Sequence, residues 1–211
     1  MSLVLALDTT AETGSLALVS GSRVLEEVAL QAPGGFSPIL FQEIERLLVR
    51  ARIELSAIEG FAAAAGPGSF TGIRVGLAAV KGLAEATGRK AAGVSNLGAL
   101  AALGSRDLRA VVINAQRGEV YAAVYSSRGE VVLPEVVVGL ERWLPCVPPG
   151  AEFLTTDAAW LASQIPQAER ITEHKVLAGA VGLLAQRALT DPALVDANYV
   201  RKADAELFWK E

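Results

Sequence analysis

The chain has 211 residues, of which 52% are hydrophobic, and only one cysteine, Cys146. A single cysteine excludes an internal disulfide, so we expect a reducing compartment, the cytoplasm. The formal net charge of −4 argues against a protein that holds nucleic acid by itself, because that affinity comes mainly from Lys and Arg. No apolar run reaches the roughly 20 residues of a membrane-spanning helix, which predicts no membrane contact.

The first half of the chain alternates short apolar strands with helices. The predicted strands cover residues 3–8, 15–20, 23–30, 58–65 and 91–94. The predicted helices cover residues 37–53, 71–87 and 96–103. Ser37 before Pro38 predicts a capped start for the first helix, and Gly88 predicts the end of the second.

The second half repeats this order. Strands are predicted at residues 108–114, 119–126, 130–138 and 151–155, and helices at 141–144, 158–165 and 176–188. A βββ unit followed by helices therefore occurs twice. We expect an N-terminal lobe over 1–100, a smaller lobe over 101–194, and a segment over 195–211 that returns toward the first lobe. Two such lobes are typical of the α/β, actin-like ATPase (ASKHA, RNase H-like) fold.

A glycine-rich loop, Gly66-Pro67-Gly68-Ser69-Phe70-Thr71-Gly72, leads from a predicted strand into the second helix. Ser69 or Thr71 can cap that helix, and backbone amides at a helix N-terminus suit an anion or another backbone packed closely against them. The loop lacks the lysine of a P-loop and the glycine spacing of a dinucleotide fingerprint. It is therefore predicted to serve close packing rather than phosphate binding.

Small residues continue along one face of the same helix, at Gly72, Gly76, Ala79, Gly82 and Ala86. Each glycine inside a helix costs up to about 1 kcal/mol relative to alanine, so a close neighbour must compensate. That neighbour is either the sheet of this chain or a helix of a partner. In the second case the strip forms an apolar docking surface together with Phe36 and Ile39.

The first predicted turn, with Asp8, Thr9 and Thr10, offers a carboxylate for Mg²⁺ and hydroxyls for phosphate. The alternative, which we favour, is that these side chains only tie the turn through local hydrogen bonds. The turn at the matching place in the second lobe carries Asn114 and no carboxylate. These residues predict at most a weak nucleotide site, or one completed by a partner.

Residues for catalysis or for a metal are scarce. The one histidine, His174, lies between Glu173 and Lys175 and is predicted to be a surface residue. Cys146 has no identifiable base beside it in the sequence, which predicts an inert thiol. We therefore expect no catalytic residue and no metal site, and a peptidase is disfavoured.

Four segments together resemble the TsaB (YeaZ) family. They are Leu5-Ala6-Leu7-Asp8-Thr9-Thr10, the loop from Gly66 to Gly76, the hairpin Gln116-Arg117-Gly118-Glu119-Val120-Tyr121 and the tail Tyr199-Val200-Arg201. The resemblance spans nearly the whole chain, and the glycine-rich loop is its most specific part. Many relatives carry an acidic residue in place of Asn114 and His-Ser in place of Phe36-Ser37.

The resemblance implies a non-catalytic subunit needed to make threonylcarbamoyladenosine beside the anticodon of tRNA. Such proteins bind the transferase TsaD as a heterodimer, which the ATPase TsaE joins, and they form homodimers when alone. It implies no cofactor in this chain, and contact with tRNA only through the partner. The alternative is an independent ATPase or small-molecule kinase of the same fold. The role of Phe208 and Trp209, as a core cover or an interface anchor, stays open.

Overall fold

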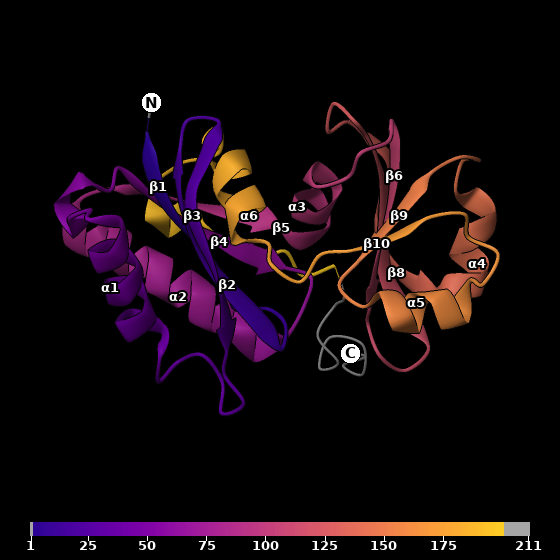
Figure 1. Cartoon of the computed structure of the whole chain (residues 1–211), viewed down its shortest axis with the longest axis horizontal. Coiled ribbons are helices and arrows are strands. Elements are labelled where there is room, and N and C mark those ends of the chain that lie inside the picture. Colours follow the sequence, from indigo (N-terminus) through magenta and orange to yellow (C-terminus); the bar gives the residue numbers. More distant parts are fainter. Residues whose placement is uncertain (1, 201–211) are drawn as a thin grey trace, which may run out of the picture. The chain divides into compact units, whose positions relative to one another are not determined.

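The computed structural model describes residues 2–200, which form two units (Figure 1). Unit 1 comprises residues 2–99 and 175–197, and unit 2 comprises residues 100–174 together with 198–200. Each unit is built on a five-stranded sheet in which three antiparallel strands are extended by two parallel ones. The strand orders, β3-β2-β1-β4-β5 and β8-β7-β6-β9-β10, are equivalent. This confirms the predicted repeat and fold class.

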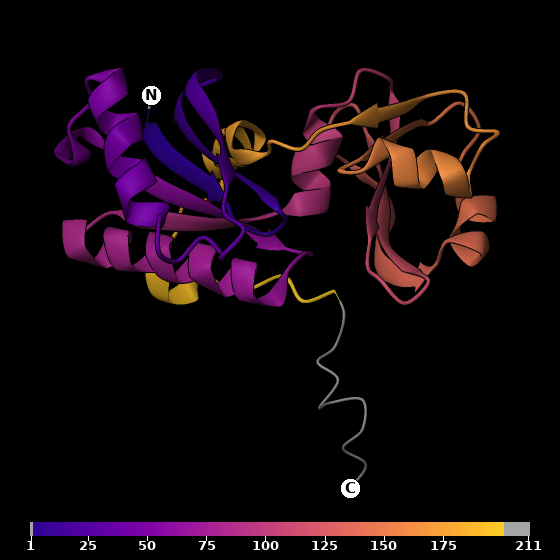
Figure 2. The ribbon, with the colours of Figure 1, turned by 60° about the horizontal axis from the view of Figure 1, so that its bottom comes forward.

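Unit 1 is a sheet with helices on both faces (Figures 1 and 2). Its strands are β1 (Leu3–Asp8), β2 (Thr13–Ser20), β3 (Arg23–Gln31), β4 (Gly60–Gly66) and β5 (Lys90–Ser95). Its helices are α1 (Leu40–Ala51), α2 (Phe70–Thr87) and α6 (Ala178–Ala185), with 3₁₀ turns at Leu55–Ala57 and Pro192–Leu194. Because side chains alternate along a strand, Leu5 and Leu7 pack against α1 and α2, while Ala6 contacts α6.

The two long helices of unit 1 begin differently. Ser37 does not cap α1; that helix begins only at Leu40, and the Phe36 carbonyl accepts hydrogen bonds from the amides of Ile39 and Leu40. In α2 the prediction holds, because Ser69 Oγ accepts a hydrogen bond from the Gly72 amide at 3.2 Å. Both helices end on a residue with positive φ, which for α2 is the expected Gly88.

Helix α6 lies on the sheet of unit 1, although the predicted lobe limits placed residues 175–194 in the second lobe. Its N-terminal amides are bound by side chains of that sheet: Ser15 Oγ accepts from Leu177 and Ala178, and Glu27 accepts from Gly179. A carboxylate at a helix N-terminus is stabilising. These long-range contacts, which a sequence pattern does not reveal, hold α6 against β2 and β3.

Unit 2 has helices on one face of its sheet. Its strands are β6 (Leu108–Asn114), β7 (Glu119–Ser126), β8 (Val131–Gly139), β9 (Glu152–Thr155) and β10 (Ile171–Glu173). Helices α4 (Leu140–Trp143) and α5 (Ala158–Gln164), with a 3₁₀ turn at Leu144–Cys146, complete it. Trp143 and Leu161 from these helices pack on Val112 and Val124 of the sheet. The three-residue strand β10 is too short to give an alternating pattern and was not predicted.

The chain passes from unit 1 to unit 2 within helix α3 (Asn96–Ala102) and again within residues 195–200. Val195 is buried in the core of unit 1, where Lys81 Nζ donates a hydrogen bond to its carbonyl at 2.9 Å. Residues 201–211, including Arg201, Phe208 and Trp209, lie outside the described residues. In the described part of the chain, no helix combines the length and apolar character needed to cross a membrane.

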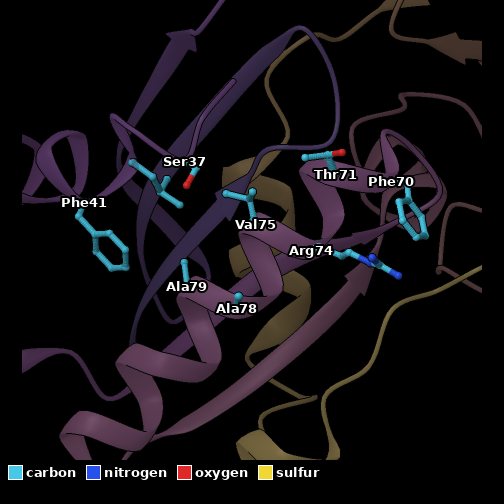
Figure 3. A pocket seen from close by; sticks show the side chains of 9 residues that line it. Ser37, Phe41, Phe70, Thr71, Arg74, Val75, Ala78 and Ala79 are labelled. Atoms are coloured by element: carbon cyan, nitrogen blue, oxygen red, sulfur yellow. The ribbon is translucent and has the colours of Figure 1, made fainter. Parts of the chain in front are cut away.

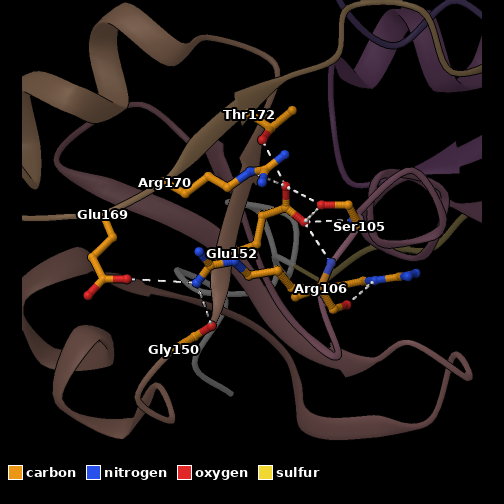
Figure 4. A network of polar contacts seen from close by, with 8 residues as sticks. Ser105, Arg106, Gly150, Glu152, Glu169, Arg170 and Thr172 are labelled. Carbon is orange, nitrogen blue, oxygen red and sulfur yellow. Dashed lines mark hydrogen bonds and ion pairs between the residues drawn. The ribbon is translucent and has the colours of Figure 1, made fainter.

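The buried carboxylate of Glu152 binds the backbone of Ser105 and Arg106, close to the start of unit 2 (Figure 4). Glu152 on β9 is 1% exposed and accepts hydrogen bonds from the amides of Ser105 and Arg106, at 2.7 and 3.2 Å, and from Thr172 Oγ1 at 2.9 Å. Arg170 Nε lies 3.0 Å away as its counter-ion. Burial alone would raise the pKa of Glu152, but these donors and the arginine outweigh it and lower that pKa from 4.5 to about 2.

The depressed pKa of Glu152 predicts a loss of stability in acid. The carboxylate stabilises the fold at any pH above 4.5 and loses that contribution as the pH falls toward 2. We expect Glu152→Gln to lower the free energy of unfolding at pH 7 by about 3 kcal/mol, measured by urea denaturation. The difference between variant and wild type should shrink between pH 4.5 and pH 2.5. A constant difference over that range would contradict the proposed ionisation.

Candidate functional site

The glycine-rich loop is packed against the turn between β1 and β2. The amide of Ser69 donates to the carbonyl of Thr10 at 2.8 Å, and Thr9 Oγ1 donates to the carbonyl of Gly72 at 2.7 Å. A Cβ atom at Gly68 would lie 2.7 Å from the Thr10 carbonyl oxygen, and one at Gly72 would overlap that of Thr9. The glycines therefore let two backbone segments of this chain meet closely.

Asp8, the candidate metal ligand, ties the same turn. Its Oδ1 atom accepts hydrogen bonds from the amide of Thr10 at 2.8 Å and from Thr10 Oγ1 at 2.6 Å, and the residue is 1% exposed. Burial raises the pKa of Asp8 above its usual value, although the hydrogen bonds from Thr10 act in the opposite direction. Asp8 thus makes local hydrogen bonds within its own turn, as the alternative favoured from the sequence describes.

Asn96, the first residue of α3, completes this network and was not recognised in the sequence. Its Nδ2 donates to Thr10 Oγ1 at 2.5 Å and its Oδ1 accepts from the amide of Gly66 at 3.0 Å, and the residue is 2% exposed. One side chain thus joins the β1–β2 turn to the end of β4. The only signal in the sequence was its place directly after a parallel strand, where polar residues gather in α/β folds.

The two turns that were considered for a magnesium–nucleotide site both make local hydrogen bonds. Asp8 Oδ1 accepts from the Thr10 amide, and in the matching turn of unit 2 the Asn114 Oδ1 accepts from the Gln116 amide at 2.8 Å and brings no charge. Among residues 2–200, no group of three or more His, Cys, Asp or Glu is placed to hold a metal. His174 is half-buried rather than a surface residue, and its Nε2 is enclosed without a hydrogen-bond partner.

The strip of small residues on α2 divides into an inner and an outer part. Gly72 and Gly76 are buried, and a Cβ atom at Gly76 would lie 2.7 Å from Thr9 Oγ1. For these two positions the interior alternative applies: the neighbour of Gly72 is the β1–β2 turn, and Gly76 also meets Leu7 and Ala63 of the sheet. Gly82 is exposed, and a Cβ atom there would meet nothing within 4 Å. Phe36 is also internal, because its ring packs on Gly14.

An apolar groove of about 480 Å³ lies between α1 and α2 (Figure 3). It is lined by Ser37, Leu40, Phe41, Phe70, Thr71, Arg74, Val75, Ala78 and Ala79. Phe41 of α1 is 58% exposed and Phe70 of α2 is 51% exposed, and they stand at opposite ends of the groove. The Arg74 guanidinium lies 3.7 Å from the centre of the Phe70 ring, a cation–π arrangement.

Of the six predicted interface residues, Ala79 lines this groove, and Ile39 is half-buried just before α1. The exposed aromatic residues Phe41 and Phe70 were not proposed from the sequence. The sequence feature that could have indicated them is the position of each aromatic side chain, Phe41 on the polar side of α1 and Phe70 at the first residue of α2. A side chain at such a position contributes little to the core of the chain itself.

The sequence resembles known proteins over most of its length. The model of the TsaD family, tRNA N6-adenosine threonylcarbamoyltransferase, matches residues 31–181. The tRNA threonylcarbamoyladenosine biosynthesis protein TsaB of Bacillus subtilis (strain 168) is 31% identical over 146 residues, which are 67% of this chain and 64% of that protein. The alignment therefore spans slightly less than two thirds of that relative.

Two further relatives are matched over a larger share of their own length than the Bacillus subtilis protein. TsaB of Escherichia coli (strain K12) is 31% identical over 173 residues, which are 75% of this chain and 72% of that protein. The crystal structure of YeaZ from Pseudomonas aeruginosa superposes with a TM-score of 0.78 at 29% identity and covers 94% of this chain and 100% of that one. The shared fold thus extends over the whole of that chain and nearly the whole of this one.

The two kinds of glycine on α2 predict opposite effects of the same substitution. Gly72→Ala places a methyl group on the Thr9 carbonyl and is expected to lower the free energy of unfolding by about 3 kcal/mol. Gly82→Ala meets open space and should raise it by about 0.5–1 kcal/mol through helix propensity. Urea denaturation followed by circular dichroism measures both. Equal effects at the two positions would refute the division of the strip.

Asp8→Asn tests whether the carboxylate acts through its charge. The folded state favours protonated Asp8, so its contribution to stability is full below pH 3.8 and declines as the pH rises through the raised pKa. We expect Asp8→Asn, which keeps an oxygen for the Thr10 amide, to be at least as stable as wild type at pH 7. The variant should also lose less stability than wild type between pH 4 and pH 8.

Titration with Mg-ATP distinguishes an Asp8 that only ties its turn from the metal ligand that the kinase alternative requires. Heats of binding for the wild-type chain should indicate an affinity no better than millimolar, unchanged in Asp8→Asn. Micromolar binding that disappears in Asp8→Asn would show that the carboxylate is a metal ligand.

Proposed function

The chain belongs to the TsaB family, and we propose that it acts in tRNA threonylcarbamoyladenosine biosynthesis as a non-catalytic subunit. In this role it binds a TsaD-type transferase as a heterodimer, and the pair recruits a TsaE-type ATPase. The names of the two TsaB relatives support the pathway. The net charge of −4 supports contact with tRNA through the transferase rather than directly.

The groove between α1 and α2 is the observation that carries this proposal. Phe41 and Phe70 are large apolar side chains that remain more than half exposed at its ends. Half-exposed aromatic residues around an apolar hollow are typical of protein–protein contact surfaces, where Phe and Arg are enriched. Arg74 adds a cation at one end, stacked on Phe70.

The chemistry of the partner follows from the shared design of the two proteins. The TsaD family model spans residues 31–181 and so includes both α1 and α2. A TsaD-type partner therefore carries a comparable helix pair, and two such pairs with apolar faces pack together as a four-helix arrangement. When the transferase is absent, a second copy of this chain occupies the groove and gives a homodimer.

We assign the nucleotide of the complex to the partner proteins or to a surface shared with them. The support is the geometry of the two candidate turns, in which Asp8 and Asn114 are engaged by their own backbones. The chain contributes by binding and orienting the transferase. An independent ATPase or kinase would need these same groups to face a ligand.

A charge in the groove is expected to abolish the heterodimer. Phe41→Glu places a carboxylate at one end of the groove, where the proposed contact would desolvate it, and should weaken binding to the TsaD-type protein of the same organism at least 100-fold. The matched control is Leu25→Glu on β3, where the side chain is 47% exposed in the same unit. It should change the affinity less than threefold, measured by isothermal titration calorimetry.

The same variants enter a threonylcarbamoylation assay with the TsaD- and TsaE-type proteins and tRNA. Activity should require the wild-type chain, persist with Leu25→Glu and be lost with Phe41→Glu. Full activity without the chain would refute the proposed function, and tight binding by Phe41→Glu would refute the groove as the contact surface.

A further inference from the structure

The groove between α1 and α2 has opposite charges near its two ends. Arg74 lies at the Phe70 end, where its guanidinium stacks on the aromatic ring (Figure 3). Glu45 follows Phe41, which marks the other end, by one turn on the same side of α1, and Glu45 is exposed. The apolar groove therefore has a cation at one end and an anion at the other.

The chemistry of both groups suits an ion pair across an interface. Glu43, the other acidic residue of α1, is paired with Arg46 at 2.6 Å, whereas no residue of the range 2–200 forms an ion pair with Glu45. Stacking on Phe70 occupies the face of the Arg74 guanidinium, whose N–H groups point outward in its plane, the geometry that holds a carboxylate.

A second copy of this chain can cover the groove about a two-fold axis in two ways. An axis along the groove places each end on its own counterpart, so that Arg74 meets Arg74 and Glu45 meets Glu45 of the other copy. An axis across the groove brings opposite ends together, so that Arg74 of each copy meets Glu45 of the other. Like charges in a contact disfavour it, and opposite charges fix its register. The charges therefore favour the axis across the groove.

We propose that the free chain forms a two-fold homodimer in which Arg74 of each copy pairs with Glu45 of the other. This inference rests on the proposed function in one respect, the use of the groove as the contact surface. The same arrangement places Phe41 of one copy at the Phe70 end of the other, so that aromatic side chains more than half exposed in the single chain cover each other. Because the contact is isologous, it closes with two copies.

Charge reversal tests the pairing. Arg74→Glu alone and Glu45→Arg alone each create two like-charge contacts and should raise the dissociation constant of the dimer at least about 30-fold, measured by sedimentation equilibrium of the full chain. The double reversal rebuilds both ion pairs and should return the constant to within about threefold of wild type. An equimolar mixture of the two single variants should form a mixed dimer, because both of its contacts join opposite charges.

The matched controls are Arg23→Glu and Glu54→Arg, which reverse exposed charges of the same unit outside the groove and should change the dissociation constant less than about threefold. Single reversals that dimerise as well as wild type would overturn the proposal. A double reversal that does not recover would also overturn it, and so would a wild-type chain that remains monomeric at every concentration measured.

These outcomes are distinguishable from a failure of the proposed function, because dimerisation of the free chain needs neither the transferase nor tRNA. If the reversals leave the dimer intact but weaken binding of the TsaD-type protein, Arg74 and Glu45 contact the transferase and the proposed homodimer is wrong. If Phe41→Glu weakens neither the dimer nor binding of the TsaD-type protein, the groove is not a contact surface, and the proposed function loses its support as well.

Discussion

The contact between the β1–β2 turn and the start of α2 is the constraint on which unit 1 depends. The backbone of Thr9 and Thr10 occupies the space that side chains at positions 68 and 72 would need, and Thr9 and Thr10 then exchange hydrogen bonds with the loop. The Asn96 side chain hydrogen-bonds both to Thr10 in this turn and to Gly66 at the end of β4. It thereby connects three segments that are distant in the sequence. The glycines at positions 68 and 72 are therefore required by the close approach of two backbone segments of this chain.

Buried charge follows the same principle in both units, because a carboxylate leaves water only where donors replace it. Glu152 receives two amides, a hydroxyl and a guanidinium, and its pKa falls. Asp8 receives donors only from Thr10, so burial prevails and its pKa rises. The two carboxyl groups therefore contribute to stability at opposite ends of the pH scale.

Patterns that act within one element were predictable from the sequence. The strands 108–114 and 119–126 were predicted with the observed limits, and Ser69 and Gly88 marked the ends of α2, because alternation, capping and left-handed glycine are local effects. Contacts over long sequence distances were not predictable. The position of α6 depends on Ser15 and Glu27, more than 150 residues away, and the role of Asn96 depends on two loops that only the folded chain brings together.

The candidate interface shows the same limit more sharply. The small residues of α2 have one pattern in the sequence but two environments, since Gly72 and Gly76 face the β1–β2 turn and the sheet, whereas Gly82 faces open space. The inner glycines draw α2 against the sheet, and the adjoining side of the helix, with Arg74 and Val75, is left beside α1 to line the groove. The close packing of the interior and the apolar groove at the surface are therefore two consequences of one helix position. A change in the inner glycines is therefore expected to alter the groove, although neither glycine lines it.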